Sequence, residues 1–140
     1  MAIIDATNAI LGRLASVVAK RALKGEKIDI VNCEKAVVTG PKLYTITYYK
    51  QKQKRGHVFH GPDFPKQADR ILRRTVRGMI PFRTSHGLEA YKRVMCYVGM
   101  PEAFANEKIE TIPEVTVAKL TFKKYVRLGE IAKQLGSKQQ

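Results

Sequence analysis

Hydrophobic positions in the first forty residues follow two periodicities. Residues 1–5 (MAIID) and 27–31 (KIDIV) are short apolar runs that predict strands, and residues 36–38 predict a further short strand. Residues 10–24 place apolar side chains on one arc at ~100° per residue and basic ones on the opposite arc, which predicts an amphipathic helix that Thr7 or Asn8 caps. Strand, helix and strand at this spacing predict a βαβ unit with parallel strands and a right-handed crossover.

Beyond Pro41 the pattern predicts further helices around one long loop. The segment KLYTITYYKQ has β-branched residues that favour a strand, but proline at a first helical position and a three-residue apolar spacing favour a helix, and we prefer the helix. Residues 51–66, with two glycines and two prolines, predict a loop. We expect helices at 69–79, 86–93 and 128–135 and a strand at 94–98, whereas residues 102–126 are only weakly patterned.

Length and composition predict one globular domain. A chain of 140 residues with 44% hydrophobic residues can bury one core, so residues 1–140 are expected to form a single α/β domain with a frayed tail at 137–140. The side chains expected in a common core are Leu11, Leu14, Val18, Ile28, Ile30, Ile71, Val76 and Val98.

The net charge narrows the class of partner. A compact domain with a formal net charge of +14 favours an anionic partner, which is a nucleic acid, an anionic membrane surface or an acidic protein. No apolar run approaches the ~20 residues that span a bilayer, and the first residues lack a basic leader, so we expect a cytosolic protein. Cys33 and Cys96 lie in apolar stretches and form no CxxC pair, which predicts buried, reduced thiols rather than a disulfide.

Most of the excess charge lies in the middle of the chain. Residues 42–93 contain thirteen Lys or Arg and three Asp or Glu, for a net charge of +10. On the helix expected at 69–79, four arginines fall within about 100° of arc opposite an apolar face, and we call Arg70, Arg73, Arg74 and Arg77 the arginine strip. A solvated face would interleave glutamates with these cations, and the strip has none. Because the guanidinium fork binds phosphates and stacks on bases, the strip favours contact with nucleic acid.

The long loop before this helix supplies a second candidate surface. It contains four Lys or Arg residues, two histidines and two phenylalanines, Phe59 and Phe64. Such a loop can thread between RNA segments, with rings and guanidinium planes stacking on exposed bases, and we expect it to be mobile until RNA orders it. Packing against the protein is an equally good interpretation of Phe59 and Phe64.

Motifs of the common enzyme classes are absent from the sequence. It has no GxxxxGK[ST], no GxSxG and no dinucleotide-binding glycine fingerprint. His57, His60 and Asp63 make a poor set of metal ligands, and no pair of carboxylates has a spacing suited to acid–base catalysis. Motifs of the RNP, KH and zinc-finger modules are absent too. The residues therefore predict a basic α/β domain that binds nucleic acid, without catalytic residues, cofactor or metal.

Five segments of the chain resemble one protein family. They are ILGRLASVVAK at 10–20, IVNCEKAVVTG at 30–40, GPDFPKQADRILRRTVRGMIPFRTSHG at 61–87, YVGMP at 97–101 and YVRLGEIAKQLG at 125–136. In this order they resemble the universal large-subunit ribosomal protein thirteen family, in its archaeal/eukaryotic branch. Cys33, Phe82, Arg83 and His86 depart mildly from the family pattern. Since the long C-terminal extension of eukaryotic members is absent, we expect an archaeal source.

The resemblance implies a three-layer α/β/α single domain around a small, mostly parallel, Rossmann-like sheet. It implies a structural, non-catalytic constituent of the large ribosomal subunit in the cytoplasm, which binds large-subunit (23S-type) rRNA beside neighbouring ribosomal proteins and supports subunit assembly and translation. It implies no membrane, small-molecule substrate or cofactor. The alternatives are a small Rossmann-like nucleotide- or RNA-processing enzyme and a DNA-binding architectural protein.

The predicted RNA-binding region is the basic loop and helix at 51–87. Its candidate contact residues are Lys52, Lys54, Arg55, His57, Lys66, Arg70, Arg73, Arg74, Arg77, Arg83 and His86. We expect the arginine strip to contact RNA phosphates or sugars, not carboxylates of the protein.

Overall fold

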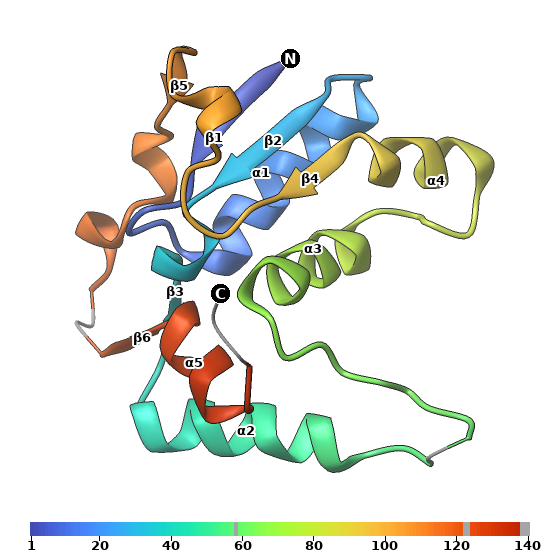
Figure 1. Cartoon of the computed structure of the whole chain (residues 1–140), viewed down its shortest axis with the longest axis vertical. Helices are drawn as coiled ribbons and strands as arrows, with labels where there is room; N and C mark the ends of the chain where they lie inside the picture. Colours follow the sequence, from blue (N-terminus) through green and yellow to red (C-terminus); the bar gives the residue numbers. More distant parts are fainter. Residues whose placement is uncertain (58, 122–123, 138–140) are drawn as a thin grey trace.

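A sheet of four parallel strands organises the computed structural model, which describes residues 1–57, 59–121 and 124–137 (Figure 1). The strands lie in the order β4-β2-β1-β5 and span Val94–Cys96, Ile28–Val31, Ala2–Asp5 and Ile109–Glu110. Strands β1 and β2 run parallel, as the βαβ pattern predicts. A second, antiparallel sheet pairs β3 (Val37–Thr39) with β6 (Tyr125–Arg127). The predicted α/β domain with a mostly parallel sheet is therefore confirmed.

The described residues form five α-helices. They are α1 (Leu11–Leu23), α2 (Lys42–Lys54), α3 (Ala68–Met79), α4 (Ser85–Lys92) and α5 (Leu128–Gln134), and short 3₁₀ turns lie at Cys33–Lys35, Glu102–Phe104, Pro113–Val115 and Val117–Lys119. Helix α1 packs against α3 and α4, whereas α2 lies at the opposite end of the molecule and packs against α5 and β6 (Figure 1). None of the described helices has the length and apolar character needed to cross a bilayer.

Both faces of the parallel sheet are buried. Leu14 and Val18 of α1 are fully buried together with Ile4 and Ile30 of the strands, so α1 supplies the apolar layer on one face. Neighbouring strand residues point to opposite faces, and Val31, which follows Ile30, is buried as well. Every residue of β2 is buried, as is typical of a central parallel strand covered on both sides.

The start of α1 and the start of the long loop differ from expectation. The N-cap of α1 is Ile10 and makes no side-chain capping hydrogen bond, while Asn8 adopts a left-handed φ of 56° in the turn before it. The expected cap at Thr7 or Asn8 is therefore wrong. Helix α2 continues to Lys54, because the QKQK segment has good helix formers and only Gly56 interrupts it, so the loop begins at residue 55 rather than 51.

The expected core is correct except at Val98, whose side chain is 46% exposed. Strand β4 ends at Cys96, and the chain then turns at Gly99 with a φ of +69°, so Val98 lies past the edge of the sheet. Strands β5 and β6, which lie in the weakly patterned segment 102–126 and at its end, were not predicted. They contain two and three residues, and such short strands show no alternation in the sequence.

The two cysteines are buried and free, as predicted. Contact with Cys96 and burial both raise the pKa of the Cys33 thiol well above its usual value, which keeps it protonated and unreactive. At the C-terminus, the Ser137 amide donates a hydrogen bond to the Ala132 carbonyl (3.0 Å), and the remainder of the expected frayed tail lies outside the described residues.

Candidate nucleic-acid interface

Helix α3 separates an apolar face from a cationic face. Ile71, Leu72 and Val76 are at most 1% exposed and anchor the helix in the core. The arginine strip lies on the other face, with Arg70 exposed and the other three side chains half-buried. The predicted amphipathic division is confirmed along the helix, and only near its end is an apolar side chain, that of Met79, 42% exposed.

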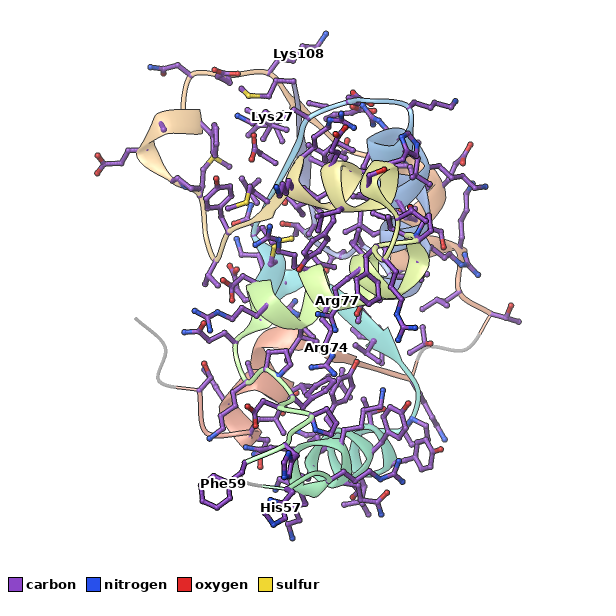
Figure 2. All side chains as sticks on the ribbon, turned by 90° about the vertical axis from the view of Figure 1, so that its right-hand side faces the viewer. Lys27, His57, Phe59, Arg74, Arg77 and Lys108 are labelled. Atoms are coloured by element: carbon purple, nitrogen blue, oxygen red, sulfur yellow. The ribbon has the colours of Figure 1, made fainter. Side chains whose placement is uncertain are left out.

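All four arginines of the strip line one groove. This arginine groove has a volume of about 340 Å³, and Pro65 and Tyr91 complete its walls. Figure 2 views the molecule from this side, with Arg74 and Arg77 near its centre. The sequence predicted a strip of cations on one face of the helix, and the tertiary structure adds a concave shape that focuses their positive potential.

Aromatic rings hold three of the guanidinium groups. Arg73 lies over Tyr91, Arg74 over Phe64 and Arg77 over Phe82, with guanidinium carbon to ring-centroid distances of 4.7, 4.9 and 5.0 Å. These cation–π contacts restrict the planar groups without using their N–H donors. Sequence reasoning missed Tyr91 and Phe82; Phe82 follows Arg77 closely in sequence, but Tyr91 comes from α4 and gave no local signal.

The guanidinium donors of the strip have few partners within the chain. Arg74 Nη1 donates to the Asp63 carbonyl at 2.7 Å, and the buried Arg73 Nε has no hydrogen-bond acceptor among the described residues. None of the ion pairs between described residues includes an arginine of the strip. Because no carboxylate of the described residues pairs with the strip, an oxygen-rich anion in the groove would meet positive charge that the protein leaves uncompensated.

Phe64 connects the strip to two further candidate residues. Lys52 Nζ of α2 lies 5.6 Å from the Phe64 ring centroid, on which Arg74 also packs. Lys66 and Arg70 together line a neighbouring groove of about 370 Å³. Phe64 is partly buried against the core, so packing against the protein is the correct interpretation of this residue. Phe59, in contrast, is 85% exposed.

The other candidate residues are exposed and lie outside the linings of these two grooves. They are Lys54, Arg55, His57, Arg83 and His86. His57 lies at the tip of the long loop, where its amide donates to the Gly61 carbonyl (3.1 Å) and its ring lies 5.8 Å from that of Phe59, at the lower end of Figure 2. The structure thus brings six of the eleven candidates together and leaves five around them.

Within residues 1–57, 59–121 and 124–137, no three His, Cys, Asp or Glu side chains gather in a way that could hold a metal ion. The arrangement of arginines, rings and open grooves instead suits an extended polyanion. It offers planar donors at several points along one helix, which match the repeated phosphates of a nucleic acid backbone.

Comparison with known proteins identifies the family. The pattern of the family described as "Ribosomal protein L13" matches residues 1–103. The chain is 45% identical over 139 residues to the large ribosomal subunit protein uL13 of Methanosarcina barkeri, with 99% of both chains covered. It is 48% identical over 136 residues to uL13 of Methanopyrus kandleri, covering 96% of this chain and 86% of that protein. It is 47% identical over 142 residues to uL13 of Methanocaldococcus jannaschii, with 99% of both covered. The chain therefore belongs to the ribosomal protein L13 family.

Proposed function

We propose that this chain is a structural constituent of the large ribosomal subunit that binds 23S-type rRNA through the arginine groove. Its relatives are named large ribosomal subunit proteins, which supports the place of action in the cytoplasmic ribosome. The observation that carries RNA binding is the convergence of four arginines on one groove without a carboxylate partner among the described residues. The role is architectural and not catalytic.

The groove suits phosphates for a physical reason. Rings already restrict the guanidinium groups of Arg73, Arg74 and Arg77, so less side-chain entropy is lost when they bind. Their planar forks present N–H donors in pairs, which match the oxygens of a phosphate. Lys52, which lies over Phe64, and Lys66, which lines the neighbouring groove, continue the cationic surface.

The exposed candidate residues extend the contact outside the groove. Lys54, Arg55 and Arg83 meet more distant phosphates of the same RNA and contribute to affinity through counterion release, while His57 and His86 form hydrogen bonds to it. Because the basic region is open on several sides, the folded RNA surrounds it, and neighbouring ribosomal proteins bind the less basic surfaces. Binding of this kind stabilises the RNA fold during subunit assembly.

A salt titration of binding to a large-subunit rRNA fragment tests the groove. Replacing Arg70 or Arg77 by alanine should weaken binding and lower the slope of log affinity against log salt by about one. Lys108→Ala is the matched control, because it removes one exposed cation at the opposite end of the molecule from the loop tip (Figure 2). Equal losses for Lys108→Ala and the groove variants would overturn the proposal, since only net charge would then matter.

A sedimentation experiment tests the ribosomal role. The chain should travel with large subunits through a sucrose gradient at high salt, and the Arg73→Ala/Arg77→Ala double variant should be released at a lower salt concentration. A processing enzyme or a DNA-binding protein would leave the particle under these conditions. Recovery of the chain only in the free fractions would contradict the proposal.

A further inference from the structure

Helix α2 leaves aromatic side chains in solvent. It buries only Thr45 and Tyr49, while Tyr44 and Tyr48 are 70% and 44% exposed. The two exposed rings are one helical turn apart and nearly parallel, with an interplanar angle of 12° and centroids 6.5 Å apart. Single exposed apolar side chains are ordinary, but two adjacent exposed rings form an aromatic patch, a feature that is common at binding sites.

The protein holds this pair of rings in place. Tyr48 packs edge-on against Tyr49 with centroids 5.7 Å apart, and Tyr49 is 8% exposed and anchored against Phe64. Lys52 Nζ lies 4.4 Å from the Tyr48 centroid on the next turn. A groove of about 350 Å³ runs beside both exposed rings, and Gly40 and Pro41 form part of its other wall.

The charge beside the rings indicates the kind of partner. Helix α2 carries four lysines and no carboxylate, and only Lys42 forms an ion pair, with Glu130, among the described residues. Lysine is depleted in the centres of protein–protein interfaces. Aromatic rings beside unpaired cations are instead typical of single-stranded nucleic acid sites, where bases stack and the backbone follows the positive charge.

We propose that Tyr44 and Tyr48 form a stacking platform for unpaired RNA bases. The platform lies on α2, outside the linings of the arginine groove. It stacks on the faces of bases, whereas the arginine groove binds phosphates. The two surfaces meet at Phe64, which contacts Lys52 of α2 and Arg74 of α3. This inference rests on the proposed function because it assigns an unpaired segment of the same RNA to a second surface.

Two RNA probes distinguish the platform from the groove. The full chain is titrated with a single-stranded 12-nucleotide oligoadenylate and with a blunt RNA duplex that has no unpaired base. Tyr44→Ala and Tyr48→Ala should each lower affinity for the single strand about 5- to 150-fold, because a base–aromatic stack is worth about 1–3 kcal/mol. Duplex affinity should change less than about twofold.

Two further variants and one optical signal complete the test. Tyr44→Phe should retain affinity because it keeps the ring, and Leu43→Ala should be neutral because this side chain, 81% exposed, points away from the rings at ~100° per residue. The chain has no tryptophan and six tyrosines, so its intrinsic fluorescence reports tyrosine directly. The single strand should quench it, and Tyr44→Ala should remove part of that quench.

The outcomes separate this inference from the proposed function. Unchanged single-strand affinity in the alanine variants, with duplex binding intact, overturns the platform and leaves the rRNA role standing. Loss of incorporation into large subunits with normal binding of both RNAs assigns the rings to a protein neighbour and also overturns it. If the unmodified chain binds neither probe nor a large-subunit rRNA fragment, the proposed function fails first.

Discussion

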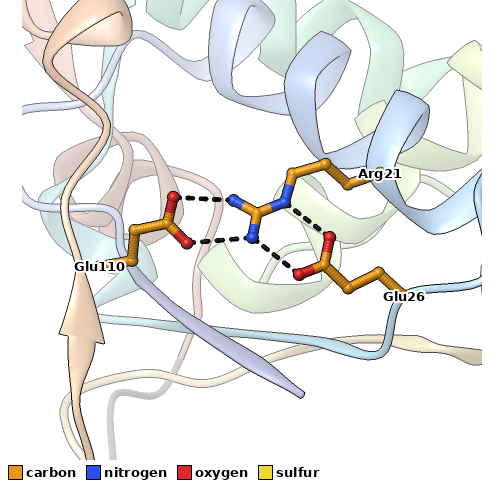
Figure 3. Close-up of polar contacts among 3 residues, drawn as sticks. All are labelled: Arg21, Glu26 and Glu110. Atoms are coloured by element: carbon orange, nitrogen blue, oxygen red, sulfur yellow. Dashed lines mark hydrogen bonds and ion pairs between the residues drawn. The ribbon is translucent and has the colours of Figure 1, made fainter.

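Arg21 of helix α1 is expected to stabilise the position of the edge strand β5 through an ion pair. Its guanidinium forms two bidentate ion pairs, one to Glu26 (2.8 and 2.7 Å) and one to Glu110 (3.0 and 2.9 Å), as Figure 3 shows. Glu110 belongs to β5, which has only two residues and pairs with β1 through Ile109 and Glu110 itself. A strand of two residues forms few backbone hydrogen bonds to its neighbour, so the ion pair between Arg21 and Glu110 contributes to holding β5 in place.

The magnitude follows from geometry and exposure. The side chain of Arg21 is 24% exposed, and those of Glu26 and Glu110 are 34% and 49% exposed, so solvent screens both pairs. An exposed pair is worth about 0.2–1 kcal/mol, and two shared bidentate pairs lie at the upper end. We expect Arg21→Ala to lower the free energy of unfolding by about 1–2 kcal/mol, which lowers Tm by about 3–8 °C.

The lowered pKa of Glu26 predicts how the stabilisation by Arg21 changes with pH. Hydrogen bonding to Arg21 lowers the pKa of Glu26 below its usual 4.5. A lowered folded-state pKa contributes stability that is fully present above 4.5 and is lost as the pH falls through the folded-state value. The difference between the unmodified chain and Arg21→Ala should therefore be constant from pH 7 to pH 5, shrink below that, and shrink also in 1 M salt.

Urea unfolding followed by circular dichroism measures this difference at each pH. Arg21→Lys is the matched control, because it keeps the charge but loses the planar fork and should recover less than half of the loss. If the free energies of unfolding of the unmodified chain and Arg21→Ala differ by less than about 0.3 kcal/mol at pH 7 and low salt, the ion pairs gain no more than the side-chain entropy lost in forming them. A difference that is independent of both pH and salt would assign the effect to lost packing of the arginine stem.

Three further outcomes are expected. Leu14→Ala should lower the free energy of unfolding by about 2–4 kcal/mol in the same urea assay, because it leaves a cavity at a fully buried position; a change below 1 kcal/mol would contradict the packing of α1. Gly87→Ala should prevent stable folding or lower Tm by more than about 6 °C, since a Cβ there would overlap the Pro81 carbonyl, whereas the control Gly78→Ala meets open space and should be tolerated. Amide hydrogen exchange should show weak protection of the segment 55–66 in the free chain and a gain on the assembled subunit; strong protection in the free chain would refute the expected mobility.

Local patterns predicted those elements whose residues carry their own periodicity. Helix α1 and helix α3 were predicted within two residues at each end, because a 3.6-residue apolar repeat over twelve or thirteen residues specifies both the helix and its buried face. Strand β2 was predicted because residues 27–31 form a short, mostly apolar run, and the structure buries every residue of β2. Strands β5 and β6 were missed because a pairing of two or three residues depends on the partner strand.

The sequence by itself determined the basic character of residues 42–93 and the separation of apolar and cationic faces on α3. Both properties follow from residue type and helical angle alone. Only the tertiary structure decided that the four arginines share a groove, because Tyr91 and Pro65 reach it from elements outside α3. It also decided that α2 presents two aligned rings, since burial of Tyr49 fixes which side of that helix faces solvent. Side chains distant in sequence meet through packing of the whole core, and no local pattern specifies such contacts.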